Sequence, residues 1–157
     1  MGEISHDFGE LGRAMDRPLL SVHVLVVDDS ALFLEALTEM LQWHGATVTA
    51  VGTAEKALEV VEQLRPDVLL SDLEMPEKDG YWLIDRVRAL APDRGGLTPA
   101  ACLTGSAAPE DRARILQAGF QYHIAKPFDI SRLLSIVEIL VGSLRPVVAV
   151  ARAIRPM

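Results

Sequence analysis

Cysteine, long apolar runs and positive charge are all scarce in this sequence, and each shortage excludes a class of protein. Cys102 is the only cysteine among 157 residues, which rules out an internal disulfide and a metal site built from paired cysteines. No uninterrupted apolar stretch reaches the roughly 18 residues that a membrane-spanning helix needs. The first residues lack the basic and apolar segments of a secretory signal. We therefore expect a protein of the reducing cytoplasm with no membrane partner.

Basic residues are outnumbered by acidic ones, 15 to 22, which gives a formal net charge of -7. A protein with this charge is not expected to bind nucleic acid, because affinity for a polyanion comes mainly from lysine and arginine. Half of the residues are hydrophobic and 24% are charged, which is typical of a folded domain and not of a disordered chain. The length predicts one domain with a substantial core.

Short apolar segments alternate with amphipathic ones along most of the chain. Strands are expected at residues 22–27, 47–51, 67–71, 99–104 and 122–125, and helices at 31–45, 53–65, 79–90, 109–119 and 130–144. This order predicts an α/β fold, a doubly wound five-stranded parallel sheet with helices on both faces. Residues 1–20 are expected to form an N-terminal extension, residues 21–143 the domain and residues 144–157 a C-terminal tail.

Polar side chains stand where four of the predicted strands end. They are Asp28, Asp29, Asp72, Thr104 and Lys126. Because the carboxyl ends of parallel strands lie at one edge of a sheet, we expect these side chains to lie close together. Three neighbouring carboxylates repel one another unless a cation lies among them, and Mg²⁺ prefers oxygen ligands.

The same edge of the sheet has the groups that a phosphoryl transfer needs. A carboxylate can act as a nucleophile toward phosphorus and form an aspartyl phosphate. The ammonium group of Lys126 and the hydroxyl group of Thr104 could then stabilise the phosphoryl oxygens. Taken singly, these residues have simpler explanations, because Asp29 or Ser30 could cap a helix and Asp79 is expected to form a cap or turn.

Four motifs in chain order, VLVVDDS, LLSDLEMPEKDG, CLTGSA and HIAKPF, together resemble the receiver domain of two-component response regulators. The resemblance covers roughly residues 22–143. It implies the flavodoxin-like (βα)5 receiver fold and a stand-alone signalling domain, which catalyses only its own phosphorylation and dephosphorylation. Asp72 is then the phosphoacceptor, and the donor is a phosphohistidine of a sensor kinase or of a histidine phosphotransfer protein.

The resemblance also assigns the magnesium ligands and the phosphoryl-sensing residues. Asp29 and Asp72 are implied to bind Mg²⁺ directly, together with the main-chain carbonyl group of Glu74, whereas Asp28 acts mainly through a bound water. Thr104 and Lys126 are implied to sense the phosphoryl group, and the peptide bond between Lys126 and Pro127 is implied to be cis.

Two positions depart from the family pattern. His123 stands where receivers commonly have an aromatic switch residue, and a strand histidine is more often structural than a pH sensor. Gly105 follows Thr104 where the family favours alanine or serine. Glu74 and Ser106 lie two residues beyond Asp72 and Thr104, where the family varies the lifetime of the phosphoryl group.

The implied output is contact with a downstream protein through the fourth and fifth strands and the helices that follow them. Receivers often form homodimers through the same face, so a homodimer stays open. The tail could pack on the domain, prolong the last helix beyond Pro146, bind a partner or remain free.

Two other functions compete with the phosphorylated switch. The first is a phosphorylation-independent interaction module with the receiver fold, which His123, Gly105 and the tail support. The second is a phosphohydrolase of the haloacid dehalogenase type, which also uses an aspartate nucleophile and Mg²⁺. That family has an Asp-x-Asp motif after its first strand and a cap domain. Residues 28–30 of this chain read DDS and do not match that motif, so we rank this function last.

Overall fold

Five parallel strands form one sheet in the computed structural model, which describes residues 17–105 and 108–154. The strands are β1 (His23–Val27), β2 (Thr47–Val51), β3 (Val68–Asp72), β4 (Ala100–Thr104) and β5 (Tyr122–Ala125). Their order across the sheet is β2-β1-β3-β4-β5, so the chain reverses its direction of winding between β1 and β3. The predicted doubly wound parallel sheet is therefore confirmed, and the point of reversal is where such folds bind ligands.

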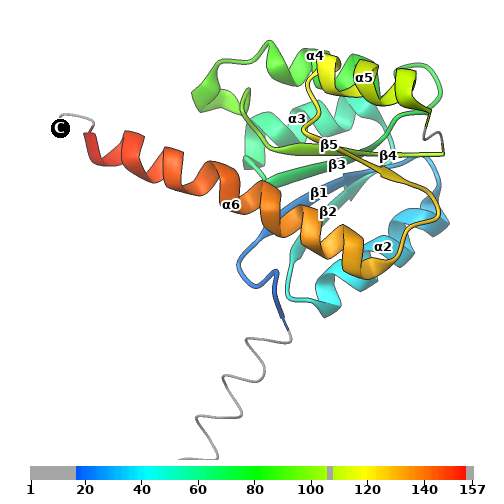
Figure 1. Ribbon diagram of the computed structural model, residues 1–157, viewed down its shortest axis with the longest axis horizontal. Helices are drawn as coiled ribbons and strands as arrows, with labels where there is room; N and C mark the ends of the chain where they lie inside the picture. Colours follow the sequence, from blue (N-terminus) through cyan, green and yellow to red (C-terminus); the bar gives the residue numbers. More distant parts are fainter. Residues whose placement is uncertain (1–16, 106–107, 155–157) are drawn as a thin grey trace, which may run out of the picture.

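Helices cover both faces of the sheet (Figure 1). They are α2 (Ala31–Trp43), α3 (Ala54–Leu64), α4 (Gly80–Arg88), α5 (Pro109–Ala118) and α6 (Ile130–Ile154), and a short 3-10 helix, η1, spans Pro92–Arg94. One buried cluster joins α2 and α6 to the sheet, and a second joins α3, α4 and α5 to the opposite face. Successive residues of β1 alternate between the two clusters, which explains why its sequence is apolar without interruption.

Helices α3 and α4 begin and end slightly inside the predicted ranges, and the residues that flank them act as caps. The side chains of Thr53 and Asp79 accept hydrogen bonds from the main chain at the starts of α3 and α4. Arg65, which was expected to be helical, has the left-handed conformation that ends α3. The prediction that Asp79 forms a cap is confirmed.

The last helix is longer than expected. The sequence predicts that it ends at residue 144, whereas α6 continues through Pro146 to Ile154 and projects beyond the edge of the sheet (Figure 1). Of the alternatives for the tail, a prolonged helix is therefore the one observed, and the expected boundary at residue 143 falls inside this helix. At the other end, Leu19 is fully buried in the cluster formed by α2 and α6, although it was assigned to the extension. Residues 1–16 and 155–157 lie outside the described residues.

Arg88 ties three segments together at the end of the sheet opposite the polar residues. Its guanidinium group donates hydrogen bonds to the main-chain carbonyl groups of Gly96, Thr98 and Gly119, at 3.0, 2.7 and 3.0 Å. It also donates to the side chain of Gln121. Burial lowers the pKa of Arg88, and the carbonyl oxygens compensate for part of the lost hydration. Arg88 thus joins α4 to the turns that precede β4 and β5.

Replacing Arg88 with methionine is expected to lower the free energy of unfolding by about 3 kcal/mol, because three carbonyl groups lose a charged donor. Urea denaturation measures the change. Arg86→Met is the matched control on the same helix, since Arg86 makes a contact with the ring of Trp82, 5.3 Å from its centroid. We expect that control to change stability by less than about 1 kcal/mol, and equal losses in both variants would contradict the account.

Candidate functional site

The sheet topology brings the expected polar residues to one edge. Asp28 and Asp29 directly follow β1, and Asp72 is the last residue of β3. Because β1 and β3 are neighbours, with Val27 opposite Ser71, the next residues along the two strands, Asp28 and Asp72, lie side by side. Thr104 ends β4, and Lys126 directly follows β5. Each of these residues ends a strand or directly follows one, so the sheet topology alone brings them to the same edge.

The three aspartates form a compact acidic cluster. One carboxylate oxygen from each of Asp28, Asp29 and Asp72 lies within 4.8 Å of the other two. Asp28 and Asp72 are buried, with 2% and 8% of their surface exposed, whereas Asp29 is exposed. This set of oxygen donors fits a hard divalent cation such as Mg²⁺, which is commonly held by one or two carboxylates and several waters.

Lys126 places its charge against the acidic cluster. Its Nζ atom lies 3.1 Å from Oδ2 of Asp28 and 3.5 Å from Oδ1 of Asp72. The same atom lies 4.4 Å from the ring centroid of Phe33, whose ring meets that of Phe128 edge-on. The ammonium group is thus held by two carboxylates and an aromatic face. The peptide bond that follows Lys126 is cis.

Opposing influences act on the Asp72 carboxyl group. Burial raises its pKa, and the neighbouring charge of Asp28 raises it further. The ammonium group of Lys126 and the main-chain N–H group of Glu74, 3.4 Å from Oδ1, act in the opposite direction. The net shift is upward. Asp72 is therefore held in an environment where its negative charge is incompletely compensated, and an additional cation would stabilise that charge.

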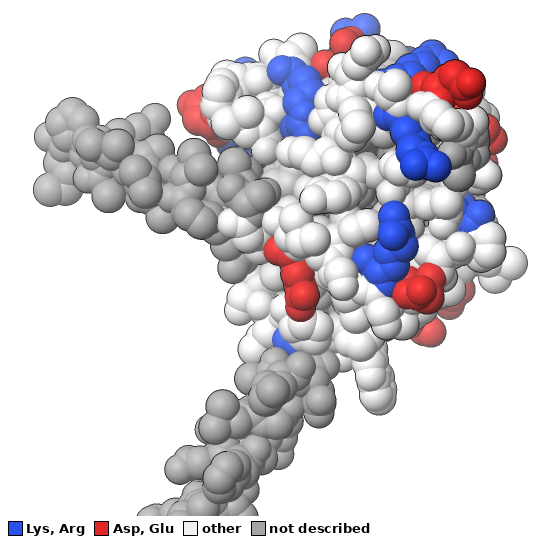
Figure 2. All heavy atoms as spheres, viewed as in Figure 1, with Lys and Arg blue, Asp and Glu red and all other residues white. Residues whose placement is uncertain are grey.

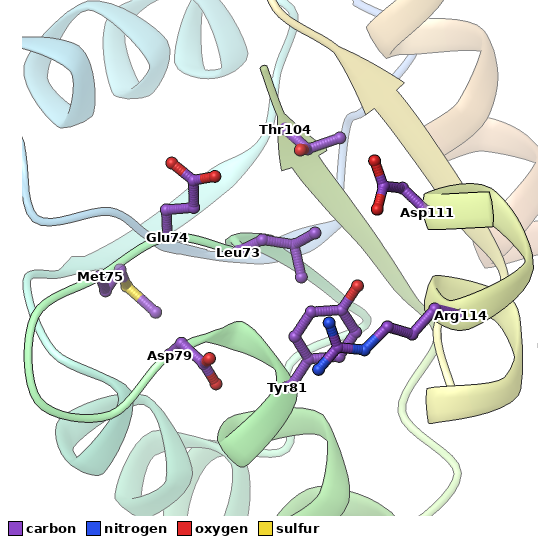
Figure 3. A pocket seen from close by; sticks show the side chains of 8 residues that line it. All are labelled: Leu73, Glu74, Met75, Asp79, Tyr81, Thr104, Asp111 and Arg114. Atoms are coloured by element: carbon purple, nitrogen blue, oxygen red, sulfur yellow. The ribbon is translucent and has the colours of Figure 1, made fainter. Parts of the chain in front are cut away.

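A groove opens beside the acidic cluster (Figure 3). It has a volume of about 760 Å³ and is lined by Leu73, Glu74, Met75, Asp79, Tyr81, Thr104, Asp111 and Arg114. One wall comes from the segment after β3 and the start of α4, and the other from the end of β4 and from α5. Thr104, which the sequence predicts to sense the phosphoryl group, lines this groove and is 3% exposed.

Sequence reasoning assigned no site role to Asp111 or Arg114, which both line the groove. Asp111 and Arg114 lie three residues apart on α5, which is the helix that follows Thr104, and residues at this spacing share a helix face. This spacing could have indicated from the sequence that the two side chains lie on one face of the helix. The contact between Arg114 and Tyr81 depends on how α5 packs against α4, and no local pattern encodes it.

His123 lies on β5, opposite Cys102 of β4, and it is not one of the acidic-cluster or groove residues. It is half-buried. Burial lowers the pKa of His123, and the nearby charges of Arg112 and Arg132 lower it further. Ser106, the other residue expected to affect the phosphoryl lifetime, lies outside the described residues.

The backbone at Gly105 has room for a side chain. A Cβ atom added there would meet no atom of the described residues within 4 Å, its chain neighbours aside, and the residue does not have the positive φ that demands glycine. Gly105→Ala is therefore expected to raise the free energy of unfolding by roughly 0.5–1 kcal/mol, because alanine restricts the unfolded chain more than glycine does. Urea denaturation tests this, with Gly119→Ala as the contrasting variant.

At Gly119 the φ angle is +126°, and a Cβ atom would lie 2.9 Å from Cγ of Arg88. Gly119→Ala should therefore lower stability. A loss of stability in Gly105→Ala would show that the segment after Thr104 is more constrained than its surroundings indicate.

The doubly wound sheet, with an acidic cluster and a lysine at the carboxyl ends of its strands, has the arrangement expected of a receiver domain of two-component signalling. The chain belongs to this family, because the model of the response regulator receiver domain matches residues 24–138. The predicted family and its fold are thereby confirmed. Within the described residues, no helix is long and apolar enough to span a membrane.

Two curated relatives illustrate the range of similar proteins. The "Uncharacterized 14.6 kDa protein in sodA1 3'region" of Leptolyngbya boryana is 41% identical over 120 residues, which make up 76% of this chain and 90% of that protein. The transcriptional regulatory protein PdtaR of Mycobacterium tuberculosis is 32% identical over 127 residues, or 80% of this chain and 60% of PdtaR. The chain spans 46–60% of this and other mycobacterial regulators that it matches.

A solved structure extends the comparison to the site. The receiver domain of the sensor histidine kinase PA1611 from Pseudomonas aeruginosa PAO1 matches with a TM-score of 0.70 and 32% sequence identity. The match covers 77% of this chain and 98% of that domain. That receiver domain was solved with a magnesium ion coordinated in its active-site cleft.

Proposed function

We propose that the protein accepts a phosphoryl group on Asp72 from a phosphohistidine of a histidine kinase or histidine phosphotransfer protein. The phosphorylated form then signals to a partner protein by a change of conformation. The observation that carries this proposal is the placement of Asp72 in the acidic cluster, with the ammonium group of Lys126 3.5 Å from its carboxylate. Membership of the receiver family supports the same function.

The transfer requires the carboxylate form of Asp72. One of its oxygens attacks the phosphorus atom, a phosphorus–oxygen bond forms, and the phosphorus–nitrogen bond to the donor histidine breaks. The electron pair of the broken bond leaves with the imidazole nitrogen. Lys126 stabilises the negative charge on the transferred oxygens, and the hydroxyl group of Thr104 donates a hydrogen bond to one of them.

Magnesium would be held by Asp28, Asp29 and Asp72, together with the main-chain carbonyl group of Glu74. When bound, the ion supplies positive charge that neutralises the carboxylates and the phosphoryl oxygens. The chemistry of the donor set supports this assignment, as does the incompletely compensated charge of Asp72. The magnesium ion in the PA1611 receiver domain supports it by analogy.

The downstream partner is proposed to bind the face formed by β4, α5, β5 and α6. This face exposes Leu116, Tyr122 and Ile139, with 52%, 38% and 50% of their surfaces accessible. His123 lies on the same strand as Tyr122 and takes the position of the switch residue. A second copy of the chain is the alternative occupant.

No nucleic-acid partner is proposed. Over the described part of the face shown in Figure 2, basic and acidic side chains are interspersed and form no continuous basic patch. The net charge of -7 points the same way. The proposal includes a cytoplasmic location, which the free, buried Cys102 supports.

Incubation with acetyl phosphate tests the proposed function, and intact mass is the measurement. With Mg²⁺ present, we expect one added phosphoryl group per chain, and with EDTA we expect none. An adduct that forms equally in both conditions would contradict the role of the acidic cluster. No adduct in either condition would contradict phosphorylation and favour the phosphorylation-independent interaction module.

A further inference from the structure

Arg114 and Tyr81 form a contact across the groove. The guanidinium carbon of Arg114 lies 4.2 Å from the ring centroid of Tyr81, with the guanidinium group over the face of the ring (Figure 3). Tyr81 belongs to the first turn of α4, and Arg114 belongs to the second turn of α5. Among the eight residues that line the groove, Arg114 is the one with a positive charge.

Tyr81 is firmly connected to the phosphoacceptor. The preceding residue, Gly80, donates a main-chain hydrogen bond to the carbonyl group of Leu73 at 2.9 Å. A Cβ atom added to Gly80 would lie 2.5 Å from the main-chain oxygen of Asp72. The start of α4 therefore packs directly against the backbone of Asp72, and Tyr81 follows the residue that makes this contact.

Arg114 is connected to the other side of the site. It lies on α5, the helix that follows β4 and its last residue, Thr104. Thr104 and Arg114 line the same groove (Figure 3). The stack of Arg114 on Tyr81 therefore joins the element that follows the phosphoryl sensor to the element that follows the phosphoacceptor.

We propose that Arg114 and Tyr81 are a positioning pair that holds α5 against α4 in the unphosphorylated protein and thereby opposes the movement of Thr104 toward a phosphoryl group on Asp72. The inference rests on the proposed function and adds two residues that affect the equilibrium between the free and the phosphorylated conformations. A contact that forms in one of two states of a protein and is lost in the other shifts the equilibrium toward the first state, and we assign the Arg114–Tyr81 contact this role.

The expected effect is modest and measurable. Arg114 is exposed, and an exposed cation–π contact corresponds to a roughly two- to fivefold change in an equilibrium constant. Removing either partner should therefore tighten the binding of a phosphoryl analogue by about that factor. Because the two side chains act through one contact, removing both should have about the same effect as removing one.

Beryllofluoride in the presence of Mg²⁺ is the probe, and isothermal titration calorimetry of the full chain is the measurement. Arg114→Met and Tyr81→Leu should bind it two- to fivefold more tightly than the unsubstituted protein. Arg114→Lys keeps a cation and Tyr81→Phe keeps a ring, so both should retain the unsubstituted affinity. Arg112→Met removes another exposed arginine from the same helix and is the matched control.

The outcomes separate the inference from the proposed function. Unchanged or weaker binding by both Arg114→Met and Tyr81→Leu would overturn the positioning role, as would equal changes in Arg114→Lys. Circular dichroism of each variant shows that its fold is retained. An unsubstituted protein that bound no beryllofluoride would overturn the proposed function itself, and the positioning role with it.

Discussion

Asp72→Asn is expected to abolish phosphoryl uptake. An amide oxygen is a far weaker nucleophile than a carboxylate, and no other carboxylate of the acidic cluster has the same environment. Asp29 is exposed, and Asp28 is occupied by the ammonium group of Lys126 at 3.1 Å and by the main-chain N–H group of Ser30 at 2.8 Å. Intact mass after incubation with acetyl phosphate and Mg²⁺ should show the unmodified chain alone.

Stability measurements show whether the Asp72→Asn variant remains folded. The folded-state pKa of Asp72 is raised above its ordinary value, so the folded chain binds more protons than the unfolded chain between these two pKa values. Without metal, the contribution of Asp72 therefore makes stability fall as pH rises through this window, and asparagine removes that contribution. The variant should be at least as stable as the unsubstituted protein at neutral pH in EDTA. Continued phosphorylation of the variant would exclude Asp72 as the acceptor.

Lys126→Met should separate phosphorylation from the conformational response. Methionine is also unbranched and nearly as long as lysine, but it lacks the charge that lies near Asp28, Asp72 and the ring of Phe33. A phosphoryl group on Asp72 would then have no ammonium group to attract, and the residues around the end of β5 should not shift toward it. In amide NMR spectra, we expect the phosphorylated variant to lose most of the shift that phosphorylation causes in the unsubstituted protein.

The same substitution has a cost in stability. Asp28 is almost fully buried, and it loses its ion-pair partner, so the metal-free protein should be destabilised by about 2 kcal/mol, a figure reduced because Lys126 is partly exposed. Lys78→Met is the matched control, since Lys78 forms an exposed ion pair with Glu55. A full spectral shift in phosphorylated Lys126→Met protein would remove the lysine from the account.

The acidic cluster could be predicted because it depends on strand ends. Once alternating strands and helices are recognised, parallel topology places the residues after β1, β3 and β5 at one edge, and the motifs supply Asp72 and Lys126. The identities of these residues and their positions along the chain are therefore sufficient to predict the acidic cluster.

The groove could not be predicted in the same way. The stack of Arg114 on Tyr81 requires α4 and α5 to pack side by side at a particular distance, which depends on side chains spread over both helices. The continuation of α6 beyond Pro146 was left open, because proline removes a hydrogen-bond donor and usually ends or kinks a helix. Leu19 was missed because a single buried side chain has no periodic pattern around it.

Chemical identification of the phosphorylated residue tests the central claim most directly. The protein is incubated with acetyl phosphate and Mg²⁺, reduced with borohydride, which converts an aspartyl phosphate to homoserine, and digested for peptide mass mapping. We predict homoserine at position 72 and unmodified aspartate at positions 28 and 29. Phosphorylation mapped to any other residue, or the absence of homoserine from a fully folded protein, would contradict the account.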